Sequence, residues 1–325
     1  MTIDISEFRP PVWLRFGMVQ TILASSEKRK NMFGGFEKES RRVVLDAGPG
    51  IKTTCYINEP FEAQGLIVLL HGWLGTPQSG YVVSAAKALF EAGFSVARLT
   101  LPEQGESALM TAEVIDLTRH DVVRNALRNL VADFTTLPLG LLGFSLGGNF
   151  ALRIARDLNQ EPINNLAKVM AVSPVIEPAH SCDKIDSIGI IRRYFLQKFQ
   201  QLTKEKQAAF PDLKAVREIE KQKSIRGLTE ILVKNWTDYP TADDYFAGYR
   251  INTNDLQTCP VDTTLLTAAD DPIIVPKFAM GLSANDNFER ILVPFGGHNG
   301  FYERFPRKVF SDAVAVDRFK RALVM

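Results

Sequence analysis

One glycine-rich heptapeptide constrains the fold of this 325-residue chain more than any other feature. Gly143-Phe144-Ser145-Leu146-Gly147-Gly148-Asn149 follows the apolar run Leu139 to Leu142 and precedes a helical pattern. So tight a turn from strand to helix strains the serine backbone, and side chains two positions to either side would collide. Gly143 and Gly147 meet that steric need. The segment predicts an exposed Ser145 hydroxyl on a rigid turn, placed to act as a nucleophile.

Two later segments supply the acid and the base that such a serine needs. A serine hydroxyl is a poor nucleophile at neutral pH, so an imidazole must take its proton and a carboxylate must orient the imidazole. Asp270 and Asp271 follow the apolar stretch Asp262 to Ala269, and His298 follows Glu289 to Phe295. The order serine, acid, histidine is typical of an α/β-hydrolase fold, and the intervals leave room for an insertion before the acid.

The choice between the two aspartates is open from the sequence. Asp271 precedes Pro272 and lies at the usual distance before Ile273 and Ile274, which favours it as the acid. Asp270 would then bond the loop backbone.

An oxyanion hole requires two backbone N–H groups that point at the developing negative charge. The first candidate donor is Leu146, because its amide opens the helix after the turn. The second is Trp73, in the segment His71-Gly72-Trp73-Leu74-Gly75 that follows the apolar run Leu66 to Leu70. The Trp73 indole would either line an acyl pocket or serve simple packing.

The chain has four histidines, of which only His298 is assigned a catalytic role. We interpret His71 as structural, bonding the loop backbone near the site. His120 and His180 have no partner that the sequence reveals.

Charge and cysteine content exclude several classes of protein. The 38 basic and 37 acidic residues give a net charge of +1, so nothing suggests nucleic acid as a partner. Cys55, Cys182 and Cys259 form neither a disulfide framework nor a zinc pattern, which favours a reducing compartment.

The segment Met1 to Glu7 lacks the basic start of a signal peptide, and no apolar run approaches the roughly 20 residues that span a bilayer. We expect a cytoplasmic protein without transmembrane segment, metal or organic cofactor.

Apolar strand patterns alternate with amphipathic helical patterns, which predicts an α/β fold with a mostly parallel central sheet covered by helices on both faces. The core would comprise residues 1–180 and 251–325, with residues 1–50 as a lead segment and Ile51 to Ile57 as the first strand. Residues 181–250 break the alternation and predict an inserted helical cap. The further expected strands are Leu66 to Leu70, Phe94 to Leu101, Leu139 to Leu142, Ala167 to Val175, Thr263 to Ala268 and Arg290 to Val293.

The expected cap is basic, with eleven Lys or Arg against five Asp or Glu between Lys184 and Arg226. It could attract an anionic substrate group, or these charges could be solvated faces of surface helices. Its aromatic residues Tyr245, Phe246 and Tyr249 suggest a pocket for an apolar acyl group.

The N-terminal segment adds a family resemblance. Phe8-Arg9-Pro10-Pro11-Val12-Trp13-Leu14 and Gly17-Met18-Val19-Gln20-Thr21-Ile22-Leu23, together with the serine, aspartate and histidine segments, resemble the YheT-like branch of α/β-hydrolases. The resemblance implies a carboxylesterase with Ser145, Asp271 and His298 as its triad. Lipid esters are substrates of eukaryotic members.

Two departures from the family pattern indicate a side branch. The family usually has histidine at the position of Met18. The segment Arg98 to Ser107 is more similar to the Asp-x-x-Gly-x-Ser loop of general hydrolases.

These observations predict a serine hydrolase that cleaves a carboxylic ester of small-molecule type, with lipid-like esters among the options, through an acyl-enzyme. Acyl transfer through the same triad and a non-catalytic binding protein are the alternatives. The sequence does not determine the oligomeric state.

Overall fold

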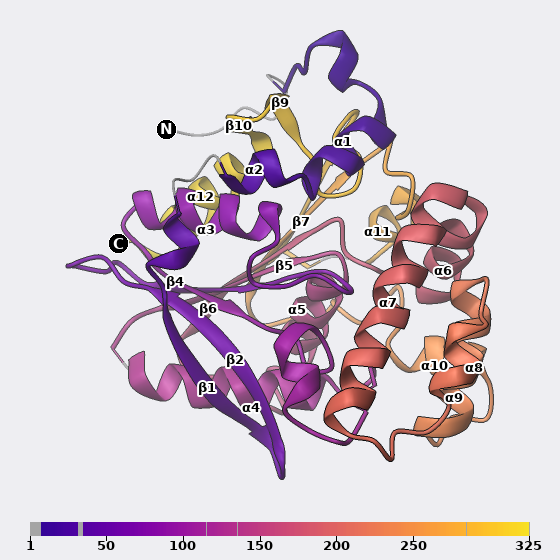
Figure 1. The fold of residues 1–325 in the computed structure, drawn as a ribbon. Helices are drawn as coiled ribbons and strands as arrows, with labels where there is room; N and C mark the ends of the chain where they lie inside the picture. Colours follow the sequence, from indigo (N-terminus) through magenta and orange to yellow (C-terminus); the bar gives the residue numbers. More distant parts are fainter. Residues whose placement is uncertain (1–7, 32–34, 115, 135, 284, 325) are drawn as a thin grey trace.

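The computed structural model describes residues 8–31, 35–114, 116–134, 136–283 and 285–324; the segment Met1 to Glu7 lies outside them. An eight-stranded sheet in the order β1-β2-β4-β3-β5-β6-β7-β8 forms the centre (Figure 1). The pairs β1–β2 and β2–β4 are antiparallel, and all other pairs of this sheet are parallel. The strands are β1 (Arg41–Gly48), β2 (Ile51–Asn58), β3 (Leu66–Leu70), β4 (Ser95–Leu99), β5 (Leu139–Phe144), β6 (Leu166–Val172), β7 (Asp262–Ala268) and β8 (Phe288–Val293), with β9 (Tyr302–Arg304) and β10 (Lys308–Val309) in a separate pair.

Helices cover both faces of the sheet, which explains why the central strands β3 and β5 consist of apolar residues and glycine. In β3, Ile67 and Leu69 pack on one side and Val68 and Leu70 on the other, and all four are buried. Helices α3 (Gly80–Glu91) and α12 (Phe310–Leu323) cover the first side, and α4 (His120–Val131) and α5 (Leu146–Asp157) cover the second. The α/β fold with a mostly parallel sheet is therefore confirmed.

A helical insertion separates β6 from β7 and lies to the right of the sheet in Figure 1. Its longest member is α7, with 21 residues. The inserted helices are α6 (Pro178–Ser187), α7 (Gly189–Ala209), α8 (Val216–Glu220), α9 (Ile225–Trp236) and α10 (Ala242–Gly248).

The lead segment contains more structure than the sequence analysis expected. The prediction of Ile51 to Ile57 as the first strand was wrong, because β1 precedes it at the edge of the sheet. Only Leu45 and Ala47 of β1 are buried, so its apolar pattern is weak. Further short elements are α1 (Gly17–Ala24), α2 (Glu27–Asn31), α11 (Pro276–Met280) and the 3-10 helices η2 (Val12–Leu14), η3 (Phe36–Lys38), η4 (Gly105–Leu109) and η5 (Ala132–Phe134).

Candidate active site

Ser145 occupies the tight turn between β5 and α5. Its φ of +53° lies in the left-handed region, a conformation that costs a non-glycine residue free energy. A Cβ at Gly143 would lie 2.2 Å from the Gly147 carbonyl oxygen, and one at Gly147 would lie 2.4 Å from the Leu70 carbonyl oxygen. Both glycines are therefore sterically required, as the sequence indicated.

The fold brings Ser145 together with His298 and Asp271. His298 Nε2 lies 2.9 Å from Ser145 Oγ, and His298 Nδ1 lies 2.9 Å from Asp271 Oδ2. All three residues are buried, with 8–9% of their surface exposed. With Nδ1–H donating to the carboxylate, Nε2 is free to accept the serine proton.

The two aspartates make different contacts. Asp271 Oδ1 accepts hydrogen bonds from the N–H groups of Ile273 and Ile274 at 2.8 and 2.9 Å, which fixes the carboxylate that faces His298. Asp270 Oδ1 instead accepts from the Gly297 N–H at 2.8 Å, as expected for the residue that bonds the loop backbone. Burial raises the pKa of Asp270.

The two expected oxyanion donors flank Ser145. A Cβ at Gly72, next to Trp73, would lie 3.2 Å from Ser145 Cβ, so this loop packs directly against the serine. Among the described residues, neither the Trp73 N–H nor the Leu146 N–H has a hydrogen-bond acceptor within the protein. Both groups are available to an oxygen of a ligand.

His71 supports the loop that contains Gly72 and Trp73 through hydrogen bonds of its ring. Its Nδ1 lies 2.8 Å from the Gly72 carbonyl oxygen, and its Nε2 accepts from the Leu101 N–H at 3.0 Å. This arrangement requires the neutral ring with the proton on Nδ1. Burial lowers the pKa of His71 to about 4, in keeping with that form. The structural role expected for His71 is confirmed.

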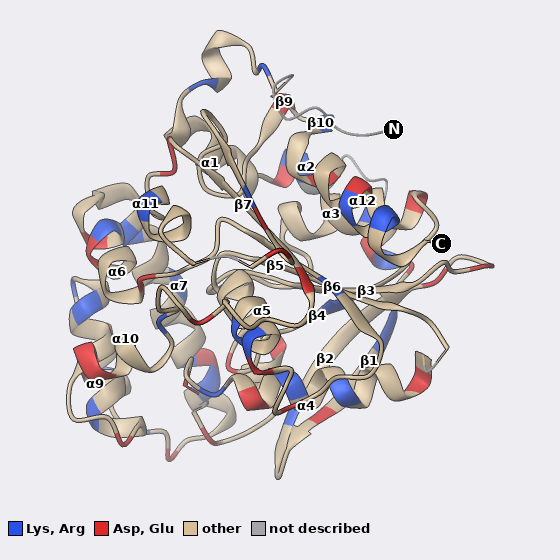
Figure 2. Cartoon of the chain, turned by 180° about the vertical axis from the view of Figure 1, so that it is seen from behind, with Lys and Arg blue, Asp and Glu red and all other residues tan. Residues whose placement is uncertain are grey.

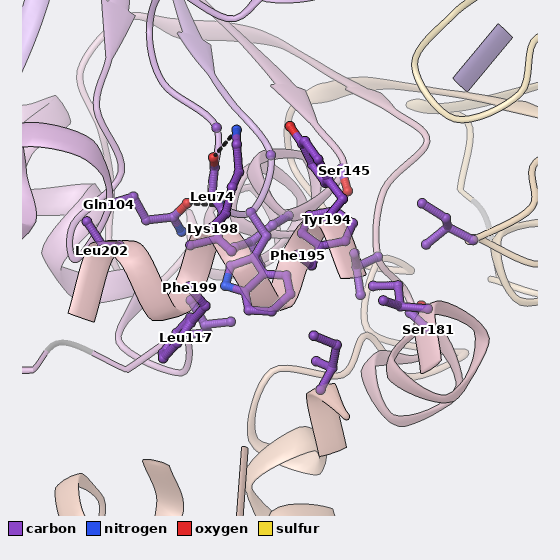
Figure 3. A pocket seen from close by; sticks show the side chains of 18 of the residues that line it. Leu74, Gln104, Leu117, Ser145, Ser181, Tyr194, Phe195, Lys198, Phe199 and Leu202 are labelled. Atoms are coloured by element: carbon purple, nitrogen blue, oxygen red, sulfur yellow. Dashed lines mark hydrogen bonds between the residues drawn. The ribbon is translucent and has the colours of Figure 1, made fainter. Parts of the chain in front are cut away.

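Leu74 completes the loop in a left-handed conformation, with φ of +54°. Its N–H donates to Gln104 Oε1 at 2.6 Å, and its carbonyl oxygen accepts from Lys198 Nζ of α7 at 3.2 Å (Figure 3). The insertion thus holds the loop that carries the Trp73 N–H.

The N-terminal helix α1 supports the loop that carries His298, a role that the sequence analysis missed. The buried Gln20 side chain accepts from the Tyr302 N–H at 2.8 Å and donates to the Leu14 carbonyl oxygen at 2.8 Å. Thr21 Oγ1 accepts from the His298 N–H at 2.9 Å. In the sequence, the segment Gly17 to Leu23 carried a family resemblance only, and it gave no signal for these contacts.

The two remaining histidines lie in ordinary packing environments. His120 Nε2 lies 2.6 Å from Asp157 Oδ2, and its Nδ1 accepts from Arg153 at 2.9 Å. Burial lowers the pKa of His120. His180 packs edge-on against Phe278 with ring centroids 5.1 Å apart. The sequence offered no signal for the Asp157 partner, because the two residues meet only when α4 packs on α5.

A cavity of about 610 Å³ extends from Ser145 between the insertion and the core, and we call it the first cavity. Two inserted helices present apolar stripes to it, and the Trp73 ring stacks on Phe195 at 5.2 Å. Tyr245, Phe246 and Tyr249 line it, as expected. The stripes are Ile191, Phe195, Phe199 and Leu202 of α7, and Ile225, Leu228, Leu232 and Trp236 of α9; Figure 3 shows part of the α7 stripe beside Ser145.

Basic residues of the insertion are partly neutralised. Lys206 is buried in an ion pair with Glu103 at 2.6 Å, and Lys204 pairs with Glu220 at 3.2 Å. Arg226 pairs with Asp183 and Asp243. Figure 2 shows Asp and Glu interspersed with Lys and Arg on these helices. These ion pairs favour the interpretation as charged faces of surface helices over a uniformly positive cap that attracts an anionic substrate group.

Among the described residues, no group of three or more His, Cys, Asp or Glu side chains could hold a metal ion. Nor does this part of the chain contain a helix with the length and apolar character needed to cross a membrane.

Residues 67–313 match the sequence profile of the alpha/beta hydrolase family, and the chain belongs to this family. The comparison with curated protein sequences gave no match.

Several solved structures share the fold at low sequence identity. The esterase Pf2001 of Pyrococcus furiosus superposes with a TM-score of 0.58 at 13% identity, over 88% of this chain and 93% of that one. Dienelactone hydrolase from Anabaena variabilis gives 0.54 at 14%, over 88% and 98%. Mouse alpha/beta hydrolase domain-containing protein 10 gives 0.52 at 11%, over 86% and 97%.

Proposed function

We propose that this protein is a serine hydrolase that cleaves carboxylic esters through an acyl-enzyme. The observation that carries the proposal is the continuous hydrogen-bonded chain from Ser145 Oγ through His298 to Asp271, with 2.9 Å at each step. These distances suit proton transfer from the hydroxyl to the imidazole during attack.

In the proposed reaction, Ser145 Oγ attacks the ester carbonyl carbon while His298 Nε2 takes the hydroxyl proton. Asp271 holds the imidazole in orientation and stabilises its protonated form. The N–H groups of Trp73 and Leu146 donate to the oxyanion. His298 then protonates the leaving alcohol, and a water molecule, deprotonated by the same nitrogen, releases the acid and regenerates the serine.

The lining of the first cavity supports the proposal that the substrate is an ester with an apolar acyl group. Its α7 and α9 stripes are apolar, and burying methylene groups against them is favourable. We propose that the insertion, residues 181–250, acts as a cap over this acyl group, and that lipid-like esters are within the substrate range.

We also propose that the chain is a side branch close to the YheT-like hydrolases and acts in the cytoplasm. The contacts of Gln20 and Thr21 give the N-terminal motif a physical role beside the His298 loop and so support the first proposal. The three buried free thiols, Cys55, Cys182 and Cys259, support the second.

Burst kinetics on p-nitrophenyl butyrate test the function. We expect a burst equivalent to the enzyme concentration, followed by turnover, and a loss of roughly 10⁴-fold or more in kcat for Ser145→Ala and His298→Ala. Turnover that survives both substitutions would contradict the assignment. Resolution of the acyl-enzyme by added alcohol faster than by water would favour acyl transfer.

A further inference from the structure

A second cavity of about 500 Å³ adjoins the first one. The two cavities share three lining residues, Val114, Leu213 and Trp236, so these side chains form the partition between them. Trp236 is the last residue of α9, and Leu213 lies in the turn between α7 and α8. Both are only partly buried, and neither occupies the interior of a helix.

The dimensions of α7 show which ligands would reach this partition. Phe195 lies near Ser145 through its stacking on Trp73, while Lys206, in the last turn of α7, also lines the first cavity. The eleven helical steps between them span roughly 16 Å, at about 1.5 Å per residue. A short acyl group on Ser145 is shorter than this span, whereas a long extended chain covers it.

The second cavity offers such a chain an apolar continuation with a polar outer rim. Its apolar part comes from Ala112, Phe210 and Pro211, in addition to the shared partition. The charged residues Glu113, Asp212 and Lys214 also line it and are exposed to solvent. Ala112 and Pro211 are exposed as well and Phe210 is half-buried, so the second cavity is a partly apolar site at the surface, which suits the end of an alkyl chain that approaches solvent.

We propose that the second cavity receives the distal end of a long-chain acyl group bound at Ser145, and that the chain passes Trp236 to reach it. The inference rests on the proposed function, since it assumes that the acyl group lies in the first cavity. On this proposal the substrates are long-chain acyl esters. Trp236 is then the side chain at which the binding of short and long acyl groups differs.

Filling the second cavity without touching the first tests the proposal. Ala209, the last residue of α7, is exposed and lines the second cavity but not the first. Ala209→Trp therefore places an indole in the second cavity. Its neighbour Ala208 is exposed and lines neither cavity, so Ala208→Trp is the matched control. We expect Ala209→Trp to lower kcat/KM for p-nitrophenyl palmitate at least fivefold and to leave butyrate unchanged. The control should change neither.

Binding measured without turnover separates this proposal from the hydrolase assignment. In the Ser145→Ala background, palmitate should displace fluorescent cis-parinaric acid, and Ala209→Trp should weaken palmitate binding at least fivefold relative to Ala208→Trp. Weakened binding in a protein that hydrolyses no ester would support the cavity and refute the function. Ester hydrolysis with palmitate binding and turnover unaffected by Ala209→Trp would overturn the cavity proposal alone.

Discussion

Thr21 Oγ1 accepts a 2.9 Å hydrogen bond from the backbone N–H of His298, 277 positions later in the chain. The same hydroxyl donates to the Gly17 carbonyl oxygen at 2.7 Å, so one side chain joins helix α1 to the loop of the proposed base. The loop itself contains residues with positive φ, including Gly297 and Asn299. A loop of this kind depends on outside contacts to hold one conformation.

Thr21→Val removes the acceptor and leaves the His298 N–H unpaired, at a cost of about 1–3 kcal/mol. We expect kcat to fall about tenfold with little change in KM, because the base is displaced while the pocket is intact. Thr21→Ser keeps the hydroxyl and should behave as the wild type. Equal kinetics of the two variants would show that the hydrogen bond does not position His298.

Gly17→Ala tests the close approach of α1 to the aspartate pair. A Cβ at Gly17 would lie 1.9 Å from the Asp270 carbonyl oxygen, so the helix must move away. We expect a lower thermal midpoint and reduced activity. A Cβ at Gly189, the first residue of α7, meets nothing within 4 Å, so Gly189→Ala is the control and should be neutral or slightly stabilising. An equal loss in both variants would refute this packing.

The contacts of the aspartate pair predict unequal effects of removing each charge. Asp271→Asn loses the carboxylate beside His298 and should lower kcat by about 10⁴-fold. Asp270→Asn keeps an oxygen that can accept from the Gly297 N–H, so kcat should fall less than about tenfold. Steady-state kinetics of both variants at one pH test this prediction. A larger loss of kcat in Asp270→Asn than in Asp271→Asn would identify Asp270 as the acid.

His71 should make stability depend on pH. Its pKa of about 4 in the folded protein lies below the ordinary value of 6.5, so between these values the unfolded chain binds more protons than the folded one. Its contribution is therefore complete above pH 6.5 and is lost as the pH falls towards 4. We expect a loss of about 2 kcal/mol between pH 7.5 and 5 from this residue.

Urea denaturation of the wild type and His71→Gln at both pH values measures that contribution. Carboxylates titrate in both proteins and cancel in the comparison. The pH-dependent loss of unfolding free energy should be smaller in His71→Gln by about 2 kcal/mol. An identical loss in both proteins would mean that His71 is not buried in its neutral form.

Local sequence rules predicted much of the sheet and the serine turn. The apolar run Leu66 to Leu70 coincides with β3, and the glycines around Ser145 answer a steric need that arises within a few residues. The order serine, acid, histidine along the chain then predicted Asp271 and His298 as partners of Ser145, because loops after parallel strands emerge at one edge of the sheet.

Contacts between distant segments were beyond such rules. Strand β1 was missed because an edge strand buries few side chains, and the His120–Asp157 contact exists only after two helices pack. The support of His298 by Thr21 likewise has no pattern of its own. The second cavity depends on where the end of α9 meets the turn after α7, which no spacing in the sequence specifies.

Labelling with a fluorophosphonate, followed by peptide mass spectrometry, tests the central claim most directly, because it needs no knowledge of the natural ester. We expect one adduct per chain on Ser145, with a labelling rate at least a thousandfold lower in His298→Ala, since the hydroxyl then lacks its base. No adduct, an adduct on another residue, or a rate that does not depend on His298 would contradict it.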